Sequence, residues 1–390
     1  MVSLLVVIYV VFISLGLPDS MFGVAWPVVH NDFQIPESFA SVYSIVTGLC
    51  SGGASFLAGV LLLKFGTANV TFISILLTSA GLLGISLAPN IWVMMLFTVV
   101  LSYGAGAIDT GLNNYVSLHY KARHMSWLHC FWGLGVTISP LIMSVFLKGG
   151  SGSWRSGYQT VALMQLSIAL LVGVFLKRWK RIEKSSLWET PVENEEKEKF
   201  NVFKIKGAIT SILSQGAYCS MEFLVGTWGA TYLVNIYGES PADAARWVSL
   251  YYGGIMLGRF ISGFLSIKAS DNTLIRGGIL TAFCGILMLT LPLGSFSVYG
   301  LLLIGIGFGP IFPSILHAVP DRFGKKYSAD LTGFHMGGAY ALGFLVQLIY
   351  GYTATATTFK ITPFVLLFFI ALLVFANETT IKAVKKSKIQ

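Results

Sequence analysis

Three acidic residues stand inside apolar stretches that are long enough to cross a membrane: Asp19, Asp109 and Glu222. A carboxylate at the centre of a bilayer costs at least about 2.5–3.5 kcal/mol, so such side chains mark ligand sites or proton relays. The rest of the 17 acidic residues fall in predicted loops or near the ends of apolar stretches. We therefore expect these three carboxylates to bind a polar solute, to exchange protons, or both.

Asp19 has a proline before it and aromatic residues after it. Pro18 removes one backbone hydrogen bond and loosens the helix at this point. Phe22 and Trp26 follow Asp19 by three and seven residues, so they share its helix face. A carboxylate beside aromatic rings and a loosened backbone suits a ligand with both polar and apolar faces, such as a sugar. The alternative is an aspartate that is hydrogen-bonded to the backbone alone.

Two further polar pairs are predicted to share helix faces. Asp109 and Asn113 are four residues apart, and together they offer a titratable acceptor and an amide that donates and accepts hydrogen bonds. His129 and Trp132 are three residues apart, and an imidazole binds a ligand in either of its charge states. The competing interpretations are a polar helix–helix contact for Asp109 and a hydrogen-bonded, buried side chain for His129.

Glu222 lies on one helix stripe with Gln215 and Tyr218, which precede it by seven and four residues. This stripe is a candidate for the second half of the ligand site. Arg259 lies within a later apolar stretch. Two interpretations of Arg259 stay open: it pairs with a carboxylate in one conformational state, or it lies in the cytoplasmic third of its helix.

The motifs of other chemistries are missing from the sequence. There is no P-loop, no HExxH or paired-cysteine spacing, and no GxSxG elbow. We therefore expect no ATP-driven pump, no metal site, no cofactor and no enzyme. His317 and His335 lie inside apolar stretches and complete the set of candidate ligand contacts.

The elements that must position these side chains are membrane helices. Hydrophobic residues make up 55% of the 390 residues and charged residues only 11%, whereas soluble proteins carry about 25% charged residues. A membrane helix needs about 20 apolar residues. The sequence therefore predicts an all-α polytopic membrane protein with twelve spans, near residues 2–30, 38–64, 69–88, 91–120, 125–148, 155–178, 204–236, 243–268, 272–292, 297–321, 330–352 and 361–377.

The net charge of +9 follows from the way basic residues are distributed around these spans. When the 26 Lys and Arg residues are assigned to alternate sides, 21 fall on one side and four on the other, and Arg259 lies within a span. Basic residues accumulate on the cytoplasmic side of membrane proteins. We expect a plasma-membrane protein with both termini in the cytoplasm, and no nucleic-acid partner.

The two halves of the chain repeat weakly at an offset of about 204 residues. Gly104-Ala-Gly-Ala parallels Gly307-Phe-Gly-Pro, and Asp19 falls one residue from the position that matches Glu222. Parallel repeats of six helices with a site near the membrane midplane are typical of secondary transporters. We predict two pseudo-symmetric six-helix bundles at residues 1–178 and 204–378, joined by a cytoplasmic linker at 179–203 and followed by a basic tail at 379–390.

At these residues the sequence resembles the major facilitator superfamily, and within it the fucose permease-like sugar:proton symporters. Three segments carry the narrower resemblance: Pro18-Asp-Ser-Met-Phe-Gly in the first span, Asp109-Thr-Gly-Leu-Asn-Asn in the fourth and Leu128-His-Cys-Phe-Trp-Gly in the fifth. In the loop after the second span, Leu63 stands where the superfamily motif has an acidic residue.

The resemblance implies a role for each matched side chain. Asp19 would bind the sugar and take part in proton coupling, and Asp109 would be linked to proton movement. His129 and Trp132, which occupy places where the family has Gln and Asn, would contact the sugar.

We expect a monomeric secondary transporter that moves a small polar solute, in the first place a monosaccharide, by proton symport with alternating access. Protonation of Asp19 or Asp109 would remove a buried charge and permit closure around the substrate. Three alternatives stay open: a sodium-coupled sugar transporter that uses the same carboxylates, a drug:proton antiporter, and a membrane sensor that transports nothing.

Overall fold

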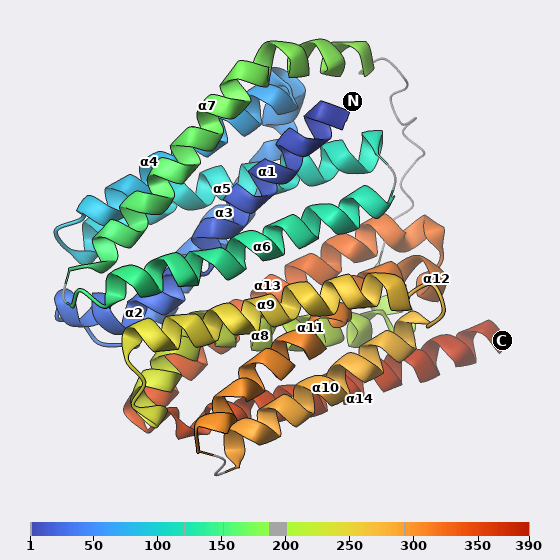
Figure 1. Ribbon diagram of the computed structural model, residues 1–390. Helices are drawn as coiled ribbons and strands as arrows, with labels where there is room; N and C mark the ends of the chain where they lie inside the picture. Colours follow the sequence, from blue (N-terminus) through green and yellow to red (C-terminus); the bar gives the residue numbers. More distant parts are fainter. Residues whose placement is uncertain (1, 121, 151, 187–200, 292–293, 390) are drawn as a thin grey trace. The chain divides into compact units, whose positions relative to one another are not determined.

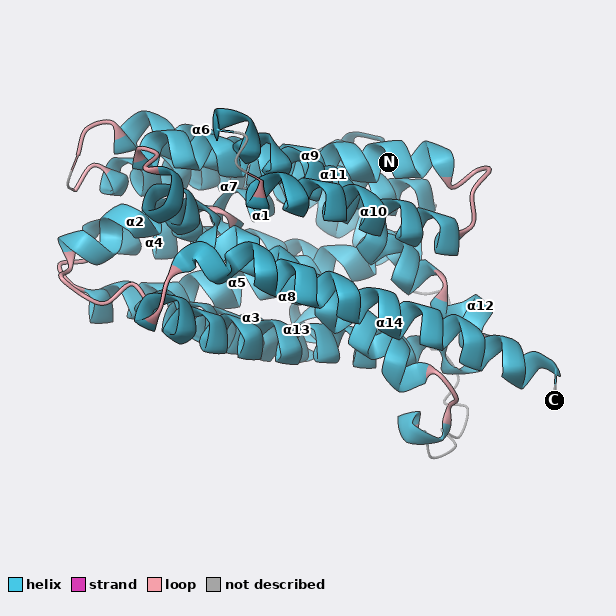
Figure 2. Ribbon diagram, turned by 90° about the horizontal axis from the view of Figure 1, so that it is seen from below, coloured by secondary structure: helices cyan, strands magenta, loops and turns pink. Residues whose placement is uncertain are grey.

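The computed structural model describes residues 2–120, 122–150, 152–186, 201–291 and 294–389. All regular structure in these ranges is helical, and none of the described residues forms a strand (Figure 2). This agrees with the composition, because in a bilayer a helix satisfies every backbone hydrogen bond within one segment.

The first half of the chain forms seven α-helices among its described residues, drawn from blue to green in Figure 1. They are α1 (Val2–Asp19), α2 (Met21–Asp32), α3 (Phe39–Phe65), α4 (Thr67–Leu87), α5 (Ile91–His119), α6 (Ala122–Leu147) and α7 (Trp154–Ser186).

The second half likewise forms seven described α-helices, from green to red. They are α8 (Ala208–Tyr232), α9 (Pro241–Leu265), α10 (Asp271–Thr290), α11 (Gly300–His317), α12 (Val319–Phe323), α13 (Lys325–Ala356) and α14 (Thr362–Ile389). Short helical turns lie at Val202–Lys204, Leu233–Tyr237, Gly294–Tyr299 and Phe359–Ile361.

The helices correspond one by one to the twelve predicted spans, with two spans each divided in two. Within the described residues, nine helical segments are both long and apolar enough to cross a membrane. The remaining three, α3, α8 and α13, have 27, 25 and 32 residues, which is sufficient length at 1.5 Å per residue. The prediction of twelve spans is confirmed.

The first span is divided at the place where the sequence predicts a loosened helix. α1 ends at Asp19, Ser20 forms a turn, and α2 begins at Met21. Pro18 lies in the last turn of α1 and has no N–H to donate to the preceding turn. As a result Asp19 lies at a helix end, where the backbone is less regular than in a continuous span.

The ends of both predicted bundles are helical over more residues than expected. α7 continues to Ser186, past the predicted start of the linker at residue 179, and residues 187–200 of that linker lie outside the described residues. The predicted basic tail at 379–390 is, as far as it is described, the end of α14.

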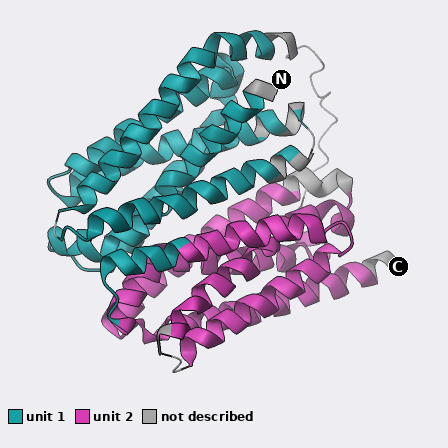
Figure 3. Ribbon diagram, in the orientation of Figure 1, with its two compact units in different colours: residues 1–192, 238–249 teal, residues 193–237, 250–390 magenta. Residues whose placement is uncertain are grey.

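The chain forms two compact units (Figure 3). Unit 1 consists of residues 1–192 and 238–249, and unit 2 consists of residues 193–237 and 250–390. The same helix pairs recur in both units: α1 packs on α6 as α8 packs on α13, α4 on α5 as α10 on α11, and α4 on α7 as α10 on α14. The predicted repeat is therefore present in the helix packing.

Matching glycines make the closest of these contacts possible. A Cβ atom at Gly104 would lie 2.7 Å from the carbonyl oxygen of Ser74 on α4, and one at Gly307 would overlap Gly278 and Ala282 on α10. Small residues let membrane helices approach each other until their backbones touch. Gly104 and Gly307 are the pair that the sequence repeat aligns, so the repeat preserves the packing of the helices.

Candidate functional site

In unit 1 the carboxylate of Asp19 is held by a side chain from α6. Trp132 Nε1 donates a hydrogen bond to Asp19 Oδ2 over 2.8 Å. The two residues are 113 positions apart in the sequence, and the family resemblance implicated both. Asp19 is exposed and Trp132 is half-buried, so the pair is accessible. It combines a hydrogen-bond acceptor with the face of an aromatic ring.

The close crossing of α1 and α6 fixes this geometry. A Cβ at Gly16 would overlap the carbonyl oxygen of Trp132, and a Cβ at Gly135 would overlap the carbonyl oxygen of Ile13. Ser20 adds a polar contact, because its hydroxyl donates to the carbonyl oxygen of Val136 over 2.9 Å. The crossing places Trp132 directly beside the end of α1.

His129 lies one turn before Trp132 on α6, as the sequence predicts. Its ring stands edge-on to Phe12 of α1, with 6.1 Å between the ring centroids, and the side chain is half-buried. Asp19, Trp132 and His129 thus line one region along the contact between α1 and α6. Their role in binding a substrate stays a prediction.

Phe22 and Trp26 lie on α2, beyond the helix break, and are buried. Phe22 stacks on Tyr43 at 3.5 Å between centroids and lies 4.9 Å from Trp26. The Trp26 indole is fully buried, and its Nε1 donates to the carbonyl oxygen of Glu37 over 2.9 Å. These rings hold the loop between α2 and α3.

Asp109 and Asn113 are paired within α5, as their spacing predicts. Asn113 Nδ2 donates to Asp109 Oδ1 over 2.7 Å and to the Asp109 carbonyl oxygen over 3.0 Å. Both side chains are half-buried. The amide stabilises the carboxylate through a neutral donor and brings no compensating charge.

In unit 2 the carboxylate of Glu222 faces a cation. Arg259 Nη2 lies 3.7 Å from Glu222 Oε1, and each side chain is only 12% exposed. The sequence left two interpretations of Arg259 open, and the structure shows the first of them, an ion pair with a carboxylate. The Tyr251 hydroxyl donates to the backbone carbonyl of Glu222 over 3.4 Å, which anchors this turn of α8 to α9.

Gln215 and Tyr218 continue the stripe of Glu222 along α8, and both are fully buried. Gln215 Nε2 donates to Cys219 Sγ over 3.8 Å. Its Oε1 atom has no hydrogen-bond partner within the described part of the chain. The Tyr218 ring packs against Phe308 of α11, with 5.4 Å between centroids.

The two histidines proposed in the second half lie in different settings. His335 is fully buried on α13; its Nδ1 donates to the Leu331 carbonyl over 2.7 Å and its Nε2 accepts from the Ser211 hydroxyl over 2.8 Å. His317 ends α11, where its side chain is 78% exposed and lies 3.0 Å from Asp271. Both imidazoles therefore have partners that hold helices together.

The contact between Glu183 and α4 could not be predicted from the sequence pattern. Glu183 of α7 is buried and accepts hydrogen bonds from the first two backbone amides of α4, from Thr67 over 2.5 Å and from Ala68 over 3.3 Å. A carboxylate at this position compensates the partial positive charge of the helix N-terminus. The partners are more than 110 residues apart, so no local spacing identifies the contact.

The three candidate carboxylates share one property: each faces an N–H donor. Asp19 faces an indole, Asp109 an amide and Glu222 a guanidinium. No group of three His, Cys, Asp or Glu side chains among the described residues is placed to hold a metal ion. Each of these carboxylates is therefore oriented by a nitrogen group of another side chain.

Comparison with known proteins gives a family match and several distant relatives. A family model described as Major Facilitator Superfamily matches residues 8–348. The glucose/galactose transporter of Brucella abortus biovar 1 (strain 9-941) is 23% identical over 351 residues, which are 85% of this chain and 82% of the relative. A relative from Helicobacter pylori (strain ATCC 700392 / 26695) is 24% identical, but the match spans only 62% of each protein.

Solved structures with the same fold extend over nearly the whole chain. A variant of the E. coli fucose:proton symporter FucP superposes with a TM-score of 0.62 at 18% identity, covering 96% of this chain and 98% of that one. At this level of identity the likeness establishes the arrangement of helices.

Proposed function

Because the chain belongs to the Major Facilitator Superfamily, we propose that it is a secondary active transporter that carries a monosaccharide together with protons by alternating access. The substrate class is supported by the Brucella relative, which is a glucose/galactose transporter, and by FucP, which is a fucose:proton symporter.

The Asp19–Trp132 pair is the observation that carries this proposal. The carboxylate accepts hydrogen bonds from sugar hydroxyls, while the indole beside it offers an apolar face. Binding sites for small molecules combine mostly apolar walls with a few placed polar groups. His129 on the same side of α6 adds a group that both donates and accepts hydrogen bonds.

Protons are the coupling ion that the surroundings of the carboxylates favour. Asp19 accepts a hydrogen bond from an indole and Asp109 from an amide, and these neutral donors leave each carboxylate with a charge that protonation can remove. In the proposed cycle, protonation of Asp19 or Asp109 lowers the cost of enclosing it without water and permits closure around the sugar. Glu222 is already compensated by Arg259.

We also propose that both termini are cytoplasmic and that the protein works as a monomer. The orientation is supported by the excess of Lys and Arg on one side of the spans. On this orientation the loop between α2 and α3 lies outside the cell.

The proposal is tested with purified protein in proteoliposomes. Uptake of labelled glucose, galactose and fucose is measured under an inward proton gradient, under a sodium gradient and under neither. We expect accumulation with the proton gradient alone, accompanied by alkalinisation of the outer medium. Accumulation driven by sodium alone would show that sodium, and not the proton, is the coupling ion. If none of the sugars is taken up and cationic drugs are exported, the protein is a drug:proton antiporter.

A further inference from the structure

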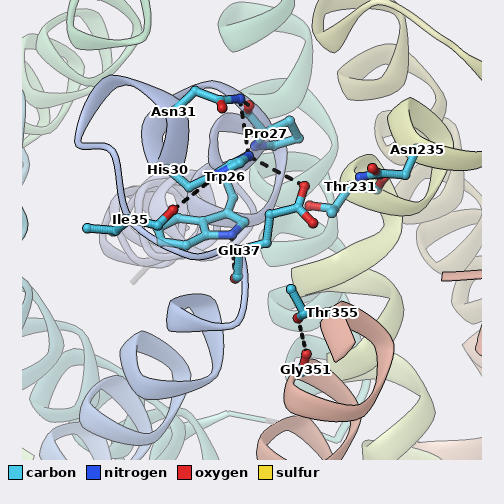
Figure 4. A network of polar contacts seen from close by, with 10 residues as sticks. All are labelled: Trp26, Pro27, His30, Asn31, Ile35, Glu37, Thr231, Asn235, Gly351 and Thr355. Carbon is cyan, nitrogen blue, oxygen red and sulfur yellow. Dashed lines mark hydrogen bonds and ion pairs between the residues drawn. The ribbon is translucent and has the colours of Figure 1, made fainter. Parts of the chain in front are cut away.

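The outer end of the first span contains an ion pair that the site above does not use. His30 lies in the last turn of α2, and its Nε2 is 3.4 Å from Glu37 Oε1 in the loop before α3 (Figure 4). The two side chains are only 13% and 19% exposed. A charged pair with so little access to water interacts more strongly than one on an open surface.

Hydrogen-bond partners determine which protonation states of His30 are satisfied. Nδ1 lies 3.4 Å from the carbonyl oxygen of Ile35, which only accepts, so this nitrogen carries a hydrogen. Nε2 has two neighbours of opposite kind: the amide nitrogen of Asn31 at 3.2 Å, which donates, and the carboxylate of Glu37, which accepts.

His30 therefore has two satisfied states that differ by one proton. In the neutral ring Nε2 accepts a hydrogen bond from Asn31. In the charged ring Nε2 forms an ion pair with Glu37, and the amide of Asn31 keeps its second bond, to the carbonyl oxygen of Pro27 over 2.9 Å. One nitrogen cannot serve both neighbours at once, so uptake of a proton exchanges an Asn31 contact for an ion pair that joins α2 to the loop.

The other charged groups at this end of unit 1 have partners of their own. Asp32 accepts from the backbone amide of Gly152 over 2.7 Å and from Trp154 Nε1 over 2.6 Å. Arg155 lies 3.8 Å from Asp32 and donates to the carbonyl oxygen of Ala88 over 2.8 Å. Glu37 is thus the carboxylate within ion-pair distance of the His30 ring.

The pair lies on a helix that is separate from α1. α2 has 12 residues and is separated from α1 by the break at Ser20. His30 is 11 residues from Asp19, about 16 Å along a helix, which is too far for direct proton transfer. The indole of Trp26 lies between them, 5.9 Å from the His30 ring and bonded to the Glu37 carbonyl. Any effect of the pair on Asp19 must act through the position of α2.

We propose that His30 and Glu37 form a second proton-binding site, which takes up one proton from the external medium and thereby fixes α2 against the loop that precedes α3. This inference rests on the proposed function, because it places the loop outside the cell and assigns Asp19 to the transport site. It gives external pH a control over transport that is separate from the protons carried with the sugar.

The test varies external pH at a fixed internal pH and measures sugar uptake by proteoliposomes. Glu37→Gln removes the charge that favours protonated His30 and leaves the backbone carbonyl that Trp26 contacts. We expect it to weaken the response of uptake to external pH, since the protonated ring then has no anion to pair with. His30→Gln should abolish this component of the pH dependence, and the double variant should behave like His30→Gln.

His124→Gln serves as the matched control, because His124 is also a hydrogen-bonded histidine of unit 1, 3.0 Å from the Tyr9 hydroxyl, but lies at the proposed cytoplasmic end. It should leave the external pH profile unchanged. An unchanged profile in His30→Gln, or equal shifts in His30→Gln and His124→Gln, would overturn the inference.

A second readout separates this inference from the proposed function. The imidazole signals of histidine-labelled protein in nanodiscs are followed by NMR as pH changes, and the signal missing from His30→Gln is that of His30. In wild-type protein this signal should change with pH, and the change should differ in Glu37→Gln. If wild-type protein carries no protons with sugar but the signal behaves in this way, the proposed function fails and the proton site stands; if Glu37→Gln leaves the response of the signal unaltered, the site fails.

Discussion

The two units hold the candidate carboxylates of their spans differently. In unit 1, Asp19 and Asp109 are held by neutral donors, an indole and an amide. In unit 2, Glu222 faces the guanidinium of Arg259. A neutral donor orients a carboxylate but leaves its charge, whereas a guanidinium cancels the charge. The difference teaches that a repeated helix frame supports two kinds of acidic site, one suited to exchanging a proton and one suited to staying charged.

Breaking the ion pair of unit 2 should have the largest effect on stability. Glu222→Gln and Arg259→Gln each leave a charge without its partner at a site that is 12% exposed, and removal of one partner of a buried pair costs about 3–5 kcal/mol. The double variant should lose less than either single variant. Unfolding of the purified protein in detergent measures these free energies.

Arg246→Gln is the matched control for this experiment. Arg246 forms an ion pair with Asp243 over 2.9 Å, but the side chains are 48% and 45% exposed. Exposed pairs contribute about 0–1 kcal/mol, so this variant should unfold almost as the wild type does. Equal losses for Arg246→Gln and Arg259→Gln would contradict the distinction between the sites.

Neutralising the carboxylates of unit 1 should change stability in the opposite direction. Asp19→Asn and Asp109→Asn keep an oxygen that accepts the hydrogen bond from Trp132 or Asn113, and they remove a charge whose insertion costs about 2.5–3.5 kcal/mol. The free energy of unfolding should hold in Asp19→Asn, whose side chain is exposed, and should hold or rise by up to about this amount in Asp109→Asn, whose side chain is half-buried, while proton-driven accumulation is lost. Exchange of labelled for unlabelled sugar, which needs no net proton movement, should continue in at least one variant.

The sign of this effect is the informative part. Proton flux that survives in both variants would remove Asp19 and Asp109 from the coupling mechanism. A loss of stability equal to that of Glu222→Gln would show that the two units hold their carboxylates in the same way.

Widening the helix crossing in unit 1 should have a smaller effect. Gly16→Ala and Gly135→Ala each force α1 away from α6, because the added Cβ overlaps a backbone carbonyl, and overpacking costs about 1–3 kcal/mol. Sugar uptake should fall as Trp132 moves away from Asp19. Gly52→Ala is the control, since a Cβ there meets nothing within 4 Å. If uptake survives in Gly16→Ala, the Asp19–Trp132 contact is not required.

The smallest expected effects come from two histidines, His335 of unit 2 and His129 of unit 1. His335→Gln removes bonds to Leu331 and Ser211, so it should lower the free energy of unfolding by about 1 kcal/mol per bond lost and leave the KM for sugar unchanged. His129→Gln should do the reverse and change the KM with little loss of stability. Both variants are measured for the free energy of unfolding and for the KM for sugar. Equal changes in His335→Gln and His129→Gln would contradict the distinction between the two histidines.

The sequence predicted the helices well because their determinants are local. Apolar runs give the spans, Pro18 gives the break at Ser20, and the four-residue spacing of Asp109 and Asn113 gives their hydrogen bond. These features depend on neighbours within one or two turns. Each of these features is therefore determined by the residues of its own helix.

Contacts between distant segments could not be predicted from the sequence pattern. Three contacts depend on helix crossings that no local spacing encodes: the Glu183 cap on α4, the Asp19–Trp132 hydrogen bond and the Glu222–Arg259 ion pair. Only the family resemblance indicated Asp19 and Trp132 together.

The matched glycine contacts have a consequence for how such a chain arises and diversifies. Gly104 and Gly307 pack their helices through the absence of a side chain, so the two halves of a duplicated gene keep the same helix contacts as long as both positions stay glycine. Mutations at the positions proposed to face the solute are then selected separately in each half. Laboratory evolution of a new specificity should accordingly accept changes around Asp19 and Glu222 readily, and should return few at the glycine crossings.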